Sequence, residues 1–201
     1  MQFKPQIRIL GIDDSPFSKL DHRAQVLVVA PVFRGGQYMD GLLSTTVTAD
    51  GLDATKHLIN MINKSRNKEQ LKLIMLDGIA LGGFNIVDIQ ELHKRTTLPV
   101  IVVIRHKPDI EAIKKALKNL PNRVQREQLL KKAGPIHTYS VEHPELGYRG
   151  KSIQFQFTGL TESEVRQVLK MTIRHGLIPE PIRVAHLIGQ GIILGESKGR
   201  A

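Results

Sequence analysis

The 201-residue chain has no cysteine and no tryptophan, and aromatic residues make up only 4% of it. The absence of cysteine excludes disulfides, thiolate zinc sites, iron–sulfur clusters and a cysteine nucleophile. Any metal must therefore be held by oxygen or imidazole ligands. The scarcity of aromatic residues argues against a single-strand binding surface made of many stacked rings.

Long apolar runs are also missing from the sequence. No segment approaches the roughly 18 consecutive apolar residues that a membrane-spanning helix requires. The N-terminal segment lacks the basic and then apolar order of a secretory signal. We therefore expect a cytoplasmic protein without a membrane span.

Positive charge is in excess in this chain. Lys plus Arg total 29 against 19 Asp plus Glu, which gives a formal net charge of +10. Nucleic acid or an anionic membrane surface has the complementary charge, and we expect nucleic acid, not a membrane, as the partner. With 41% hydrophobic residues, the length suits a single domain over residues 1–201.

Three β-strands are predicted near the N-terminus. Residues 6–13 and 25–32 are apolar runs rich in β-branched side chains, and residues 37–48 follow a turn signal that contains two glycines. Short links between these strands make them an antiparallel meander. From Asp50 onward, apolar residues at helical spacing predict a helix as far as about Lys64.

The middle of the chain has the order of a β-α-β unit. Residues 71–77 and 98–105 are nearly continuous apolar runs, of the kind that is buried on both faces of a parallel sheet. Residues 84–95 lie between them and have helical spacing. The two runs are therefore predicted to be parallel strands joined by a helix.

The C-terminal half is predicted to be mainly helical. A basic amphipathic helix is expected after Pro108, and another over residues 123–132. Residues 137–150 are the least regular stretch, which we interpret as a functional loop or insertion. Residues 152–157 alternate like a strand, and a capping box at Thr161 begins a further helix.

Three antiparallel strands followed by parallel crossovers is the order of elements in the ribonuclease H-like fold. We therefore predict an α/β protein with a mixed five-stranded sheet, flanking helices and a C-terminal helical extension. In this fold the first and fourth strands lie side by side. Asp13 ends the first strand and Asp77 ends the fourth, so their carboxylates are expected to meet at the carboxyl edge of the sheet, where α/β proteins bind ligands.

Two carboxylates that are brought together repel each other, and a divalent cation stabilises the pair. Mg²⁺ prefers hard oxygen ligands and keeps several waters, so the pair Asp13 and Asp77 predicts a magnesium site. Each acid also has a simpler interpretation as turn chemistry, because Asp77 precedes Gly78 and Asp13 begins the string Asp13-Asp14-Ser15-Pro16.

Several segments together resemble endonuclease V, an inosine-directed nuclease of ribonuclease H-like fold. Residues 177–186 are similar to the closing motif of that family, and further similar segments follow the same order over most of the chain. These segments are residues 11–13, 38–43, 76–78 and 98–105. The chain most resembles a largely archaeal branch related to endonuclease V, marked by residues 11–17 and by Asp77-Gly78 with Gly83-Phe84-Asn85.

The resemblance implies roles for individual residues, and a role in DNA repair. It implies that Asp13 and Asp77 bind Mg²⁺ or Mn²⁺. His186 stands at the C-terminal position that is acidic or histidine in the family, where an imidazole binds metal or shuttles a proton. Tyr38 falls in the segment that resembles the strand-separating wedge, and Arg105 ends the strand that ends in lysine in the family.

The departures from endonuclease V limit what the resemblance carries over. The family has a glutamate shortly after its Gly-Phe-Leu stretch, whereas this chain has Thr45-Thr46-Val47-Thr48 there. Either Asp50 supplies the ligand, with Asp53 as the next candidate, or the site has lost one. The wedge has Asp40 in place of a proline, and the family's His-Pro segment is replaced, so base specificity is not carried over.

Three functions remain open from the sequence. The first is a Mg²⁺-dependent phosphodiesterase acting on DNA or RNA, with Asp13, Asp77, His186 and Asp50 as its catalytic residues. The second is a relative that binds nucleic acid but has lost turnover, and the third is a nucleotide-binding or small-molecule-binding protein that uses glycines at 82–83 or 189–191. The residues expected to contact nucleic acid are Tyr38, Arg105, Lys114, Lys115 and Lys118, although a lysine-rich helix face is also simply a solvated one.

Overall fold

The computed structural model describes residues 3–18, 24–143 and 148–198, and the fold is given for these residues. The strands are β1 (Arg8–Asp14), β2 (Gln25–Arg34), β3 (Tyr38–Thr48), β4 (Leu71–Asp77), β5 (Ala80–Leu81), β6 (Asn85–Ile86), β7 (Val100–Ile104), β8 (His137–His143) and β9 (Tyr148–Thr158). The helices are α1 (Ala54–Asn63), α2 (Ile89–Thr96), α3 (Ile110–Leu117), α4 (Arg123–Lys132), α5 (Glu162–Thr172) and α6 (Glu180–Leu194), with a 3-10 helix at Lys68–Gln70.

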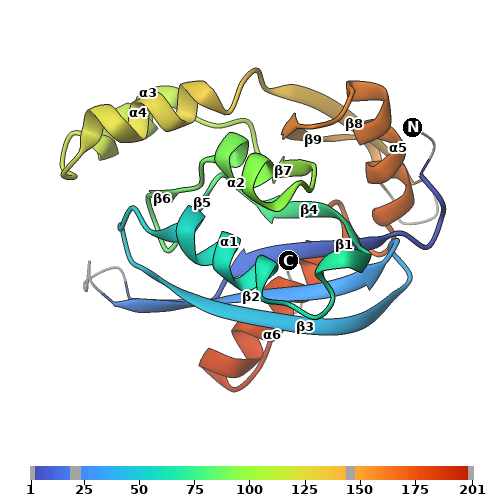
Figure 1. Ribbon diagram of the computed structural model, residues 1–201. Coiled ribbons are helices and arrows are strands. Elements are labelled where there is room, and N and C mark those ends of the chain that lie inside the picture. Colours follow the sequence, from blue (N-terminus) through green and yellow to red (C-terminus); the bar gives the residue numbers. More distant parts are fainter. Residues whose placement is uncertain (1–2, 19–23, 144–147, 199–201) are drawn as a thin grey trace.

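A mixed sheet of seven strands forms the centre of the fold, in the order β3-β2-β1-β4-β7-β9-β8, and β5 pairs with β6 in a separate hairpin (Figure 1). β1 pairs antiparallel with β2 and parallel with β4, and β7 lies parallel to β4. The predicted meander and β-α-β unit are confirmed. The first and fourth strands are neighbours, as the order of elements predicts.

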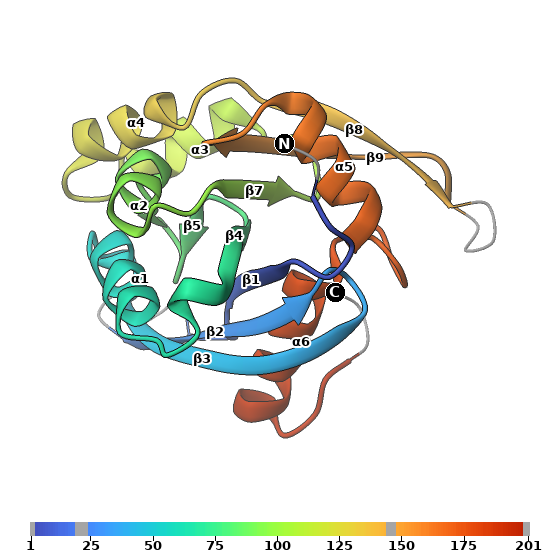
Figure 2. The ribbon, with the colours of Figure 1, turned by 45° about the vertical axis from the view of Figure 1, so that its right-hand side comes forward.

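Helices cover both faces of the sheet, with α1 and α2 on one side and α5 and α6 on the other (Figure 2). The side chains of β4 alternate between these two layers. Ile74 and Leu76 pack in the apolar cluster under α1 and α2, whereas Leu73 and Met75 pack in the cluster under α5 and α6. Because both faces are covered, β4 and β7 consist almost entirely of apolar residues.

The predicted sheet of five strands is wrong, because β8 and β9 form a hairpin that extends it beyond β7. The segment 137–150 was expected to be irregular, but most of its described residues belong to this hairpin. The outer strand β8 reads His-Thr-Tyr-Ser-Val-Glu-His, and among the side chains that the structure describes in it only Val141 is buried, so its apolar alternation is weak. An edge strand with one partly solvated face gives little hydrophobic signal.

The helix starts follow the capping signals in part. At α5 the capping box is confirmed, since Thr161 accepts from Glu164 N and the Glu164 carboxylate accepts from Thr161 N. The start of α1 was predicted at Asp50, but the helix begins at Ala54 because Asp50 has a left-handed backbone with φ of 50°. In the described part of the chain, no helix has both the length and the apolar character needed to cross a membrane.

Candidate metal centre

Asp13 and Asp77 lie side by side at the carboxyl edge of the sheet. The parallel register pairs Ile12 of β1 with Leu76 of β4, so the residue that follows each one occupies a neighbouring position. Asp13 is only 4% exposed, and its side chain and that of Asp77 both turn toward α6. The predicted meeting of these two acids is therefore present in the structure.

Helix α6 brings His186 to the same edge by packing directly on β1. A Cβ at Gly11 would overlap the backbone carbonyl of Pro181 in α6, so only glycine permits this approach. A second contact lies further along the helix, where a Cβ at Gly189 would come within 2.7 Å of the Ser15 hydroxyl. These two glycines allow α6 to lie close enough for His186 to reach the acids.

The three side chains Asp13, Asp77 and His186 form one cluster. One ligand atom from each lies within 4.8 Å of the others, and His186 Nδ1 is 2.8 Å from Asp13 Oδ2. A single cation placed among them would be within reach of two carboxylates and one imidazole. Oxygen ligands with one imidazole suit Mg²⁺ and Mn²⁺.

The electrostatics of the cluster favour a cation. Burial raises the pKa of Asp13 to about 7, the negative charges of Asp77 and Asp14 add to this rise, and the hydrogen bond with His186 opposes it. The same hydrogen bond to Asp13 raises the pKa of the His186 imidazole. Without a metal, protons are therefore held at this edge near neutral pH, and a divalent cation would take their place.

Arg105 supplies positive charge at the rim of the cluster. It follows β7 and forms an ion pair with Asp77, whose Oδ1 accepts from Arg105 Nε at 3.3 Å and whose Oδ2 accepts from a terminal guanidinium nitrogen. The Arg105 side chain keeps 28% of its surface exposed. The Arg105 side chain therefore contacts Asp77 of the cluster and is also accessible to solvent.

The structure does not bring Asp50 or Asp53 into this cluster. Asp50 Oδ1 accepts from the backbone N–H of Phe84 at 2.8 Å, which holds the β5–β6 hairpin. Asp53 precedes α1 and accepts from Thr48 and Asn85. Among the described residues, the group that could share a metal contains Asp13, Asp77 and His186, and neither alternative for the third acid.

Asp14 is a partly buried acid that the sequence analysis treated only as turn chemistry. It lies on the face opposite Asp13, because neighbouring strand residues alternate, and its Oδ2 accepts from Gly82 N at 2.8 Å. Burial raises its pKa, and the charge of Asp77 raises it further. Two adjacent acids at the end of a strand were the sequence signal for this arrangement, because neighbouring strand residues place one carboxylate on each face of the sheet.

The predicted basic residues of α3 lie on one exposed surface. Lys114, Lys115 and Lys118 line a polar hollow that also includes Arg123 of α4. Lys114 is paired with Glu111 at 2.8 Å, so part of its charge is neutralised within the helix. The hollow is a concentration of cations beyond the end of β7.

Tyr38 lies at the start of β3, which is the edge strand opposite to β8 in the sheet. Its side chain is 47% exposed. The guanidinium of Arg34 lies 5.9 Å from the centre of its ring. The neighbouring Asp40 pairs with Arg8 at 2.6 Å and with Arg34 at 3.0 Å, and these bonds lower the pKa of its carboxyl group. The charge of Asp40 is thus balanced by arginines of the two other strands of the meander, β1 and β2.

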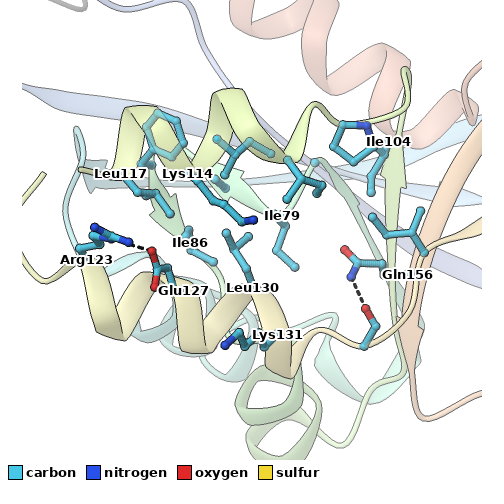
Figure 3. Close-up of a pocket in the computed structure, with 18 residues that line it drawn as sticks. Ile79, Ile86, Ile104, Lys114, Leu117, Arg123, Glu127, Leu130, Lys131 and Gln156 are labelled. Carbon is cyan, nitrogen blue, oxygen red and sulfur yellow. Dashed lines mark hydrogen bonds and ion pairs between the residues drawn. The ribbon is translucent and has the colours of Figure 1, made fainter. Parts of the chain in front are cut away.

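A cavity of about 760 Å³ lies between the sheet and the two helices α3 and α4 (Figure 3). Most of its wall is apolar, and the contributing side chains include Ile79, Phe84, Ile86, Ile104, Ile113 and Leu130. Gly78, which follows Asp77, and Ile104, which precedes Arg105, both line it. The cavity therefore begins beside the candidate metal centre, on the other face of the same sheet edge.

Gln156 of β9 is a polar group in this apolar wall. It is 5% exposed, and its Nε2 donates to the carbonyl of Gly134 at 2.7 Å. Figure 3 shows its carboxamide at the cavity, at the far end from Arg123. Arg123 and Glu127, paired at 2.6 Å, lie at the other end. The cavity is thus apolar in the middle and polar at both ends.

The glycine strings considered for phosphate binding have structural roles. Gly82 and Gly83 form the β5–β6 turn with positive φ, and Gly82 N donates to Asp14. Gly189 and Gly191 lie inside α6 and not at its N-terminus. A helix interior has no free backbone N–H groups for a phosphate, so residues 189–191 do not form a phosphate loop.

The fold and the acidic cluster define the class of protein. Solved structures of endonuclease V share the fold: human ENDOV superposes with a TM-score of 0.59 at 14% identity, covering 94% of this chain and 85% of that one. Endonuclease V of Ciona intestinalis, solved with a 24mer DNA containing an inosine, also gives a TM-score of 0.59, at 15% identity over 94% of this chain and 87% of that one. The chain is therefore an α/β protein with the fold of endonuclease V.

The particular family follows from closer relatives. The family model described as Endonuclease dU matches residues 5–193, and the chain belongs to this family. A UPF0215 protein of Methanosarcina mazei is 48% identical over 98% of this chain and 96% of its own length. A protein of unknown function from Archaeoglobus fulgidus, known from its crystal structure, has a TM-score of 0.79 and 42% identity over 92% of this chain and 98% of that chain.

Proposed function

We propose that this protein is a divalent-metal-dependent endonuclease that cleaves a phosphodiester bond in DNA. The observation that carries the proposal is the convergence of Asp13, Asp77 and His186, each with a ligand atom within 4.8 Å of the others. The fold shared with endonuclease V and the membership of the Endonuclease dU family support the same function.

Each residue of the cluster has a part in this function. Asp13 and Asp77 hold Mg²⁺ or Mn²⁺ through their carboxylate oxygens, and His186 fixes the orientation of Asp13 through their hydrogen bond. An ion held there would supply the activation of a water molecule and would neutralise charge on the phosphate. Arg105 exchanges its ion pair with Asp77 for a phosphate oxygen, since a guanidinium binds carboxylate and phosphate with the same donor geometry.

Charge and shape support nucleic acid as the substrate. The formal charge is +10, and Lys114, Lys115 and Lys118 form a basic surface beyond the metal centre. The apolar cavity begins at Gly78, so a base enters it while its phosphate lies at Asp77. The family description contains the symbol dU, which we interpret as deoxyuridine, and we take a DNA strand containing deoxyuridine as the first substrate to test.

The test measures strand cleavage with Mg²⁺, with Mn²⁺ and with EDTA. The substrates are labelled DNA strands and duplexes that contain one deoxyuridine, one deoxyinosine or neither, together with an RNA strand. We expect metal-dependent cleavage of the deoxyuridine substrate. Asp77→Asn should reduce it by more than about 100-fold, since losing a ligand exceeds the 10- to 100-fold effect of outer partners.

The matched control is Glu69→Gln, which removes one negative charge from the exposed 3-10 helix away from the cluster. It should cleave like the wild-type protein. The proposal is contradicted if no substrate is cut, or if Asp77→Asn cuts as fast as the control. Salt-sensitive DNA binding without cleavage would instead identify the binding-only relative that the missing glutamate suggests.

A second candidate function is the binding of a free small molecule, and the cavity under α3 and α4 favours it. Its volume of about 760 Å³ falls within the range of ligand pockets, and its wall is mostly apolar with a few polar groups. A nucleoside without phosphate separates the two functions. Binding of deoxyuridine nucleoside that is unaffected by Asp77→Asn, with no DNA cleavage, would support this second function.

A further inference from the structure

Gln190 is a residue of α6 whose contacts connect the metal centre to the segment after the helix. It lies one helical turn beyond His186, on the same side of α6, and its Nε2 is 3.0 Å from His186 Nε2. Its Oε1 accepts from the backbone N–H of Lys198 at 3.0 Å. That contact is possible because Gly195, with φ of 79°, ends α6 and allows the chain to turn back.

These contacts determine which way the Gln190 carboxamide faces. A backbone N–H only donates, so the group opposite Lys198 N must be the carboxamide oxygen. The NH₂ group of Gln190 therefore faces the His186 ring. The reverse orientation would place the NH₂ group against the N–H of Lys198, where two donors meet.

The orientation of Gln190 in turn determines where the neutral His186 ring carries its hydrogen. The NH₂ group of Gln190 only donates, so His186 Nε2 must accept with its lone pair. The ring hydrogen is then on Nδ1, which donates to Asp13 Oδ2 at 2.8 Å. A chain of three hydrogen bonds thus runs from Lys198 through Gln190 and His186 to Asp13.

We propose that Gln190 is a positioning residue, which keeps His186 as a hydrogen-bond donor to Asp13 and prevents it from ligating the cation. The proposal rests on the metal-dependent function proposed above, and it specifies which side chains bind the cation. Asp13 and Asp77 are then the protein ligands, and water and phosphate complete the shell, as suits Mg²⁺. Ligating carboxylates are commonly held by such outer hydrogen bonds.

Ligation by His186 Nδ1 would require a different set of contacts. The hydrogen would move to Nε2, and Nε2–H would then need an acceptor in place of the Gln190 NH₂ group. Gln190 would have to turn its oxygen toward the ring and lose the bond from Lys198 N. The contacts at both nitrogens therefore favour the form of His186 in which Nδ1 donates to Asp13 and Nε2 accepts from Gln190.

The experiment reads the ring hydrogen directly by long-range ¹H–¹⁵N NMR of the full chain with ¹⁵N-labelled histidine. Spectra are taken without metal and with saturating Mg²⁺, at an alkaline pH where the imidazole holds a single hydrogen. The His186 signals are assigned by their loss in His186→Gln. We expect hydrogen on Nδ1 in the wild-type protein, both before and after Mg²⁺ is added.

Two variants of Gln190 test its part in this arrangement. Gln190→Glu offers only acceptor oxygens to the ring and should shift the hydrogen to Nε2, whereas Gln190→Met should give a mixture of the two forms. Gln37→Glu, which adds the same charge at the β2–β3 turn, should leave the His186 signals unchanged. Calorimetric titration should show Mg²⁺ affinity weakened about 10-fold in Gln190→Met, as for other outer partners.

The proposal is overturned if wild-type His186 carries its hydrogen on Nε2, or if Nδ1 loses its hydrogen when Mg²⁺ binds. It is also overturned if Gln190→Glu leaves the hydrogen on Nδ1. The His186 signals are recorded without substrate, and the first set of spectra is also recorded without metal. An inactive nuclease would therefore contradict the proposed function and leave the position of the hydrogen as an independent result.

Discussion

Asp13 is a carboxylate buried beside two other acids, Asp14 and Asp77, with His186 as its hydrogen-bond partner. Burial raises the pKa of Asp13 to about 7 from 3.8, and the bond to Asp13 raises the pKa of His186 as well. Both groups hold more protons in the folded than in the unfolded protein. Linkage therefore makes the free energy of unfolding fall as the pH rises from about 4 to about 7.

The substitution Asp13→Asn tests this electrostatic account. It removes the charge that burial penalises, so the metal-free variant should gain stability relative to the wild-type protein as the pH rises. Between about pH 5 and about pH 8 the gain should be on the order of 2 kcal/mol. Urea unfolding in EDTA at the two pH values measures this gain. If the variant and the wild-type protein differ in free energy of unfolding by the same amount at both pH values, the account is contradicted.

The sequence predicted the three residues that converge at the candidate site, and it proposed a fourth, Asp50, that the structure does not bring there. Asp13 and Asp77 were found because they end strands whose order makes them neighbours, and His186 because its surrounding motif resembles endonuclease V. Asp50 was proposed from its distance along the chain from the expected glutamate. The structure gives it a bond to Phe84 N instead, since the β5–β6 hairpin folds back over it, a long-range contact that spacing does not reveal.

At the scale of elements, the packing of α6 on β1 sets the site, and Gly11 tests it. Gly11→Ala should force α6 away from β1 because the added Cβ overlaps the Pro181 carbonyl. Overpacking of this kind destabilises by roughly 1–3 kcal/mol, and His186 should lose its contact with Asp13. Urea unfolding should show a lower free energy of unfolding, and the rate of metal-dependent cleavage should fall as well.

Gly191→Ala is the matched control for Gly11→Ala. Gly191 also lies in α6, but a Cβ there meets no other atom within 4 Å. Replacing a glycine inside a helix by alanine should stabilise the protein by about 0.5–1 kcal/mol, with cleavage unchanged. If both variants change stability in the same direction, close packing of α6 on β1 is not what positions His186.

A buried arginine attaches α4 to the rest of the fold. Arg126 is 1% exposed and donates to backbone carbonyls of Asp50, Gly51, Phe84 and Pro121. Arg126→Met should leave these carbonyls unsatisfied and lower the free energy of unfolding by about 1–3 kcal/mol. Arg123→Met removes only an exposed pair with Glu127 and should change it by less than about 1 kcal/mol. Equal losses in urea unfolding would contradict this role.

The elements that the sequence missed are those whose burial depends on distant partners. β4 and β7 were predicted because both faces are buried and their sequences are continuously apolar. β8 was missed because it lies at the sheet edge and most of its described side chains remain partly or fully exposed, so polar residues alternate with only weak apolar signals. Its pairing with β9 provides backbone hydrogen bonds that no local pattern of side chains reveals.

At the scale of the whole molecule, the excess of positive charge predicts salt-dependent binding of nucleic acid. Replacing Lys114, Lys115 and Lys118 by Gln should weaken DNA binding and reduce the slope of log affinity against log salt by about 2 to 3. Fluorescence anisotropy over a range of salt concentrations measures this slope.

The control for the lysine variant carries Gln at Lys56, Lys94 and Lys170, three exposed lysines outside α3, and has the same net charge. Its salt slope should stay close to that of the wild-type protein. Identical slopes for the two triple variants would mean that total charge, and not the surface of α3, attracts the DNA.

The central claim is that Asp13 and Asp77 form a binding site for a divalent cation, and a Mn²⁺ titration followed by electron paramagnetic resonance tests it most directly. The account predicts one Mn²⁺ bound per wild-type chain, competition by Mg²⁺, and affinity weakened by at least about 10-fold in Asp13→Asn and in Asp77→Asn. Glu69→Gln should bind like the wild-type protein. Equal Mn²⁺ binding by the wild-type protein and by both Asp variants would contradict the account.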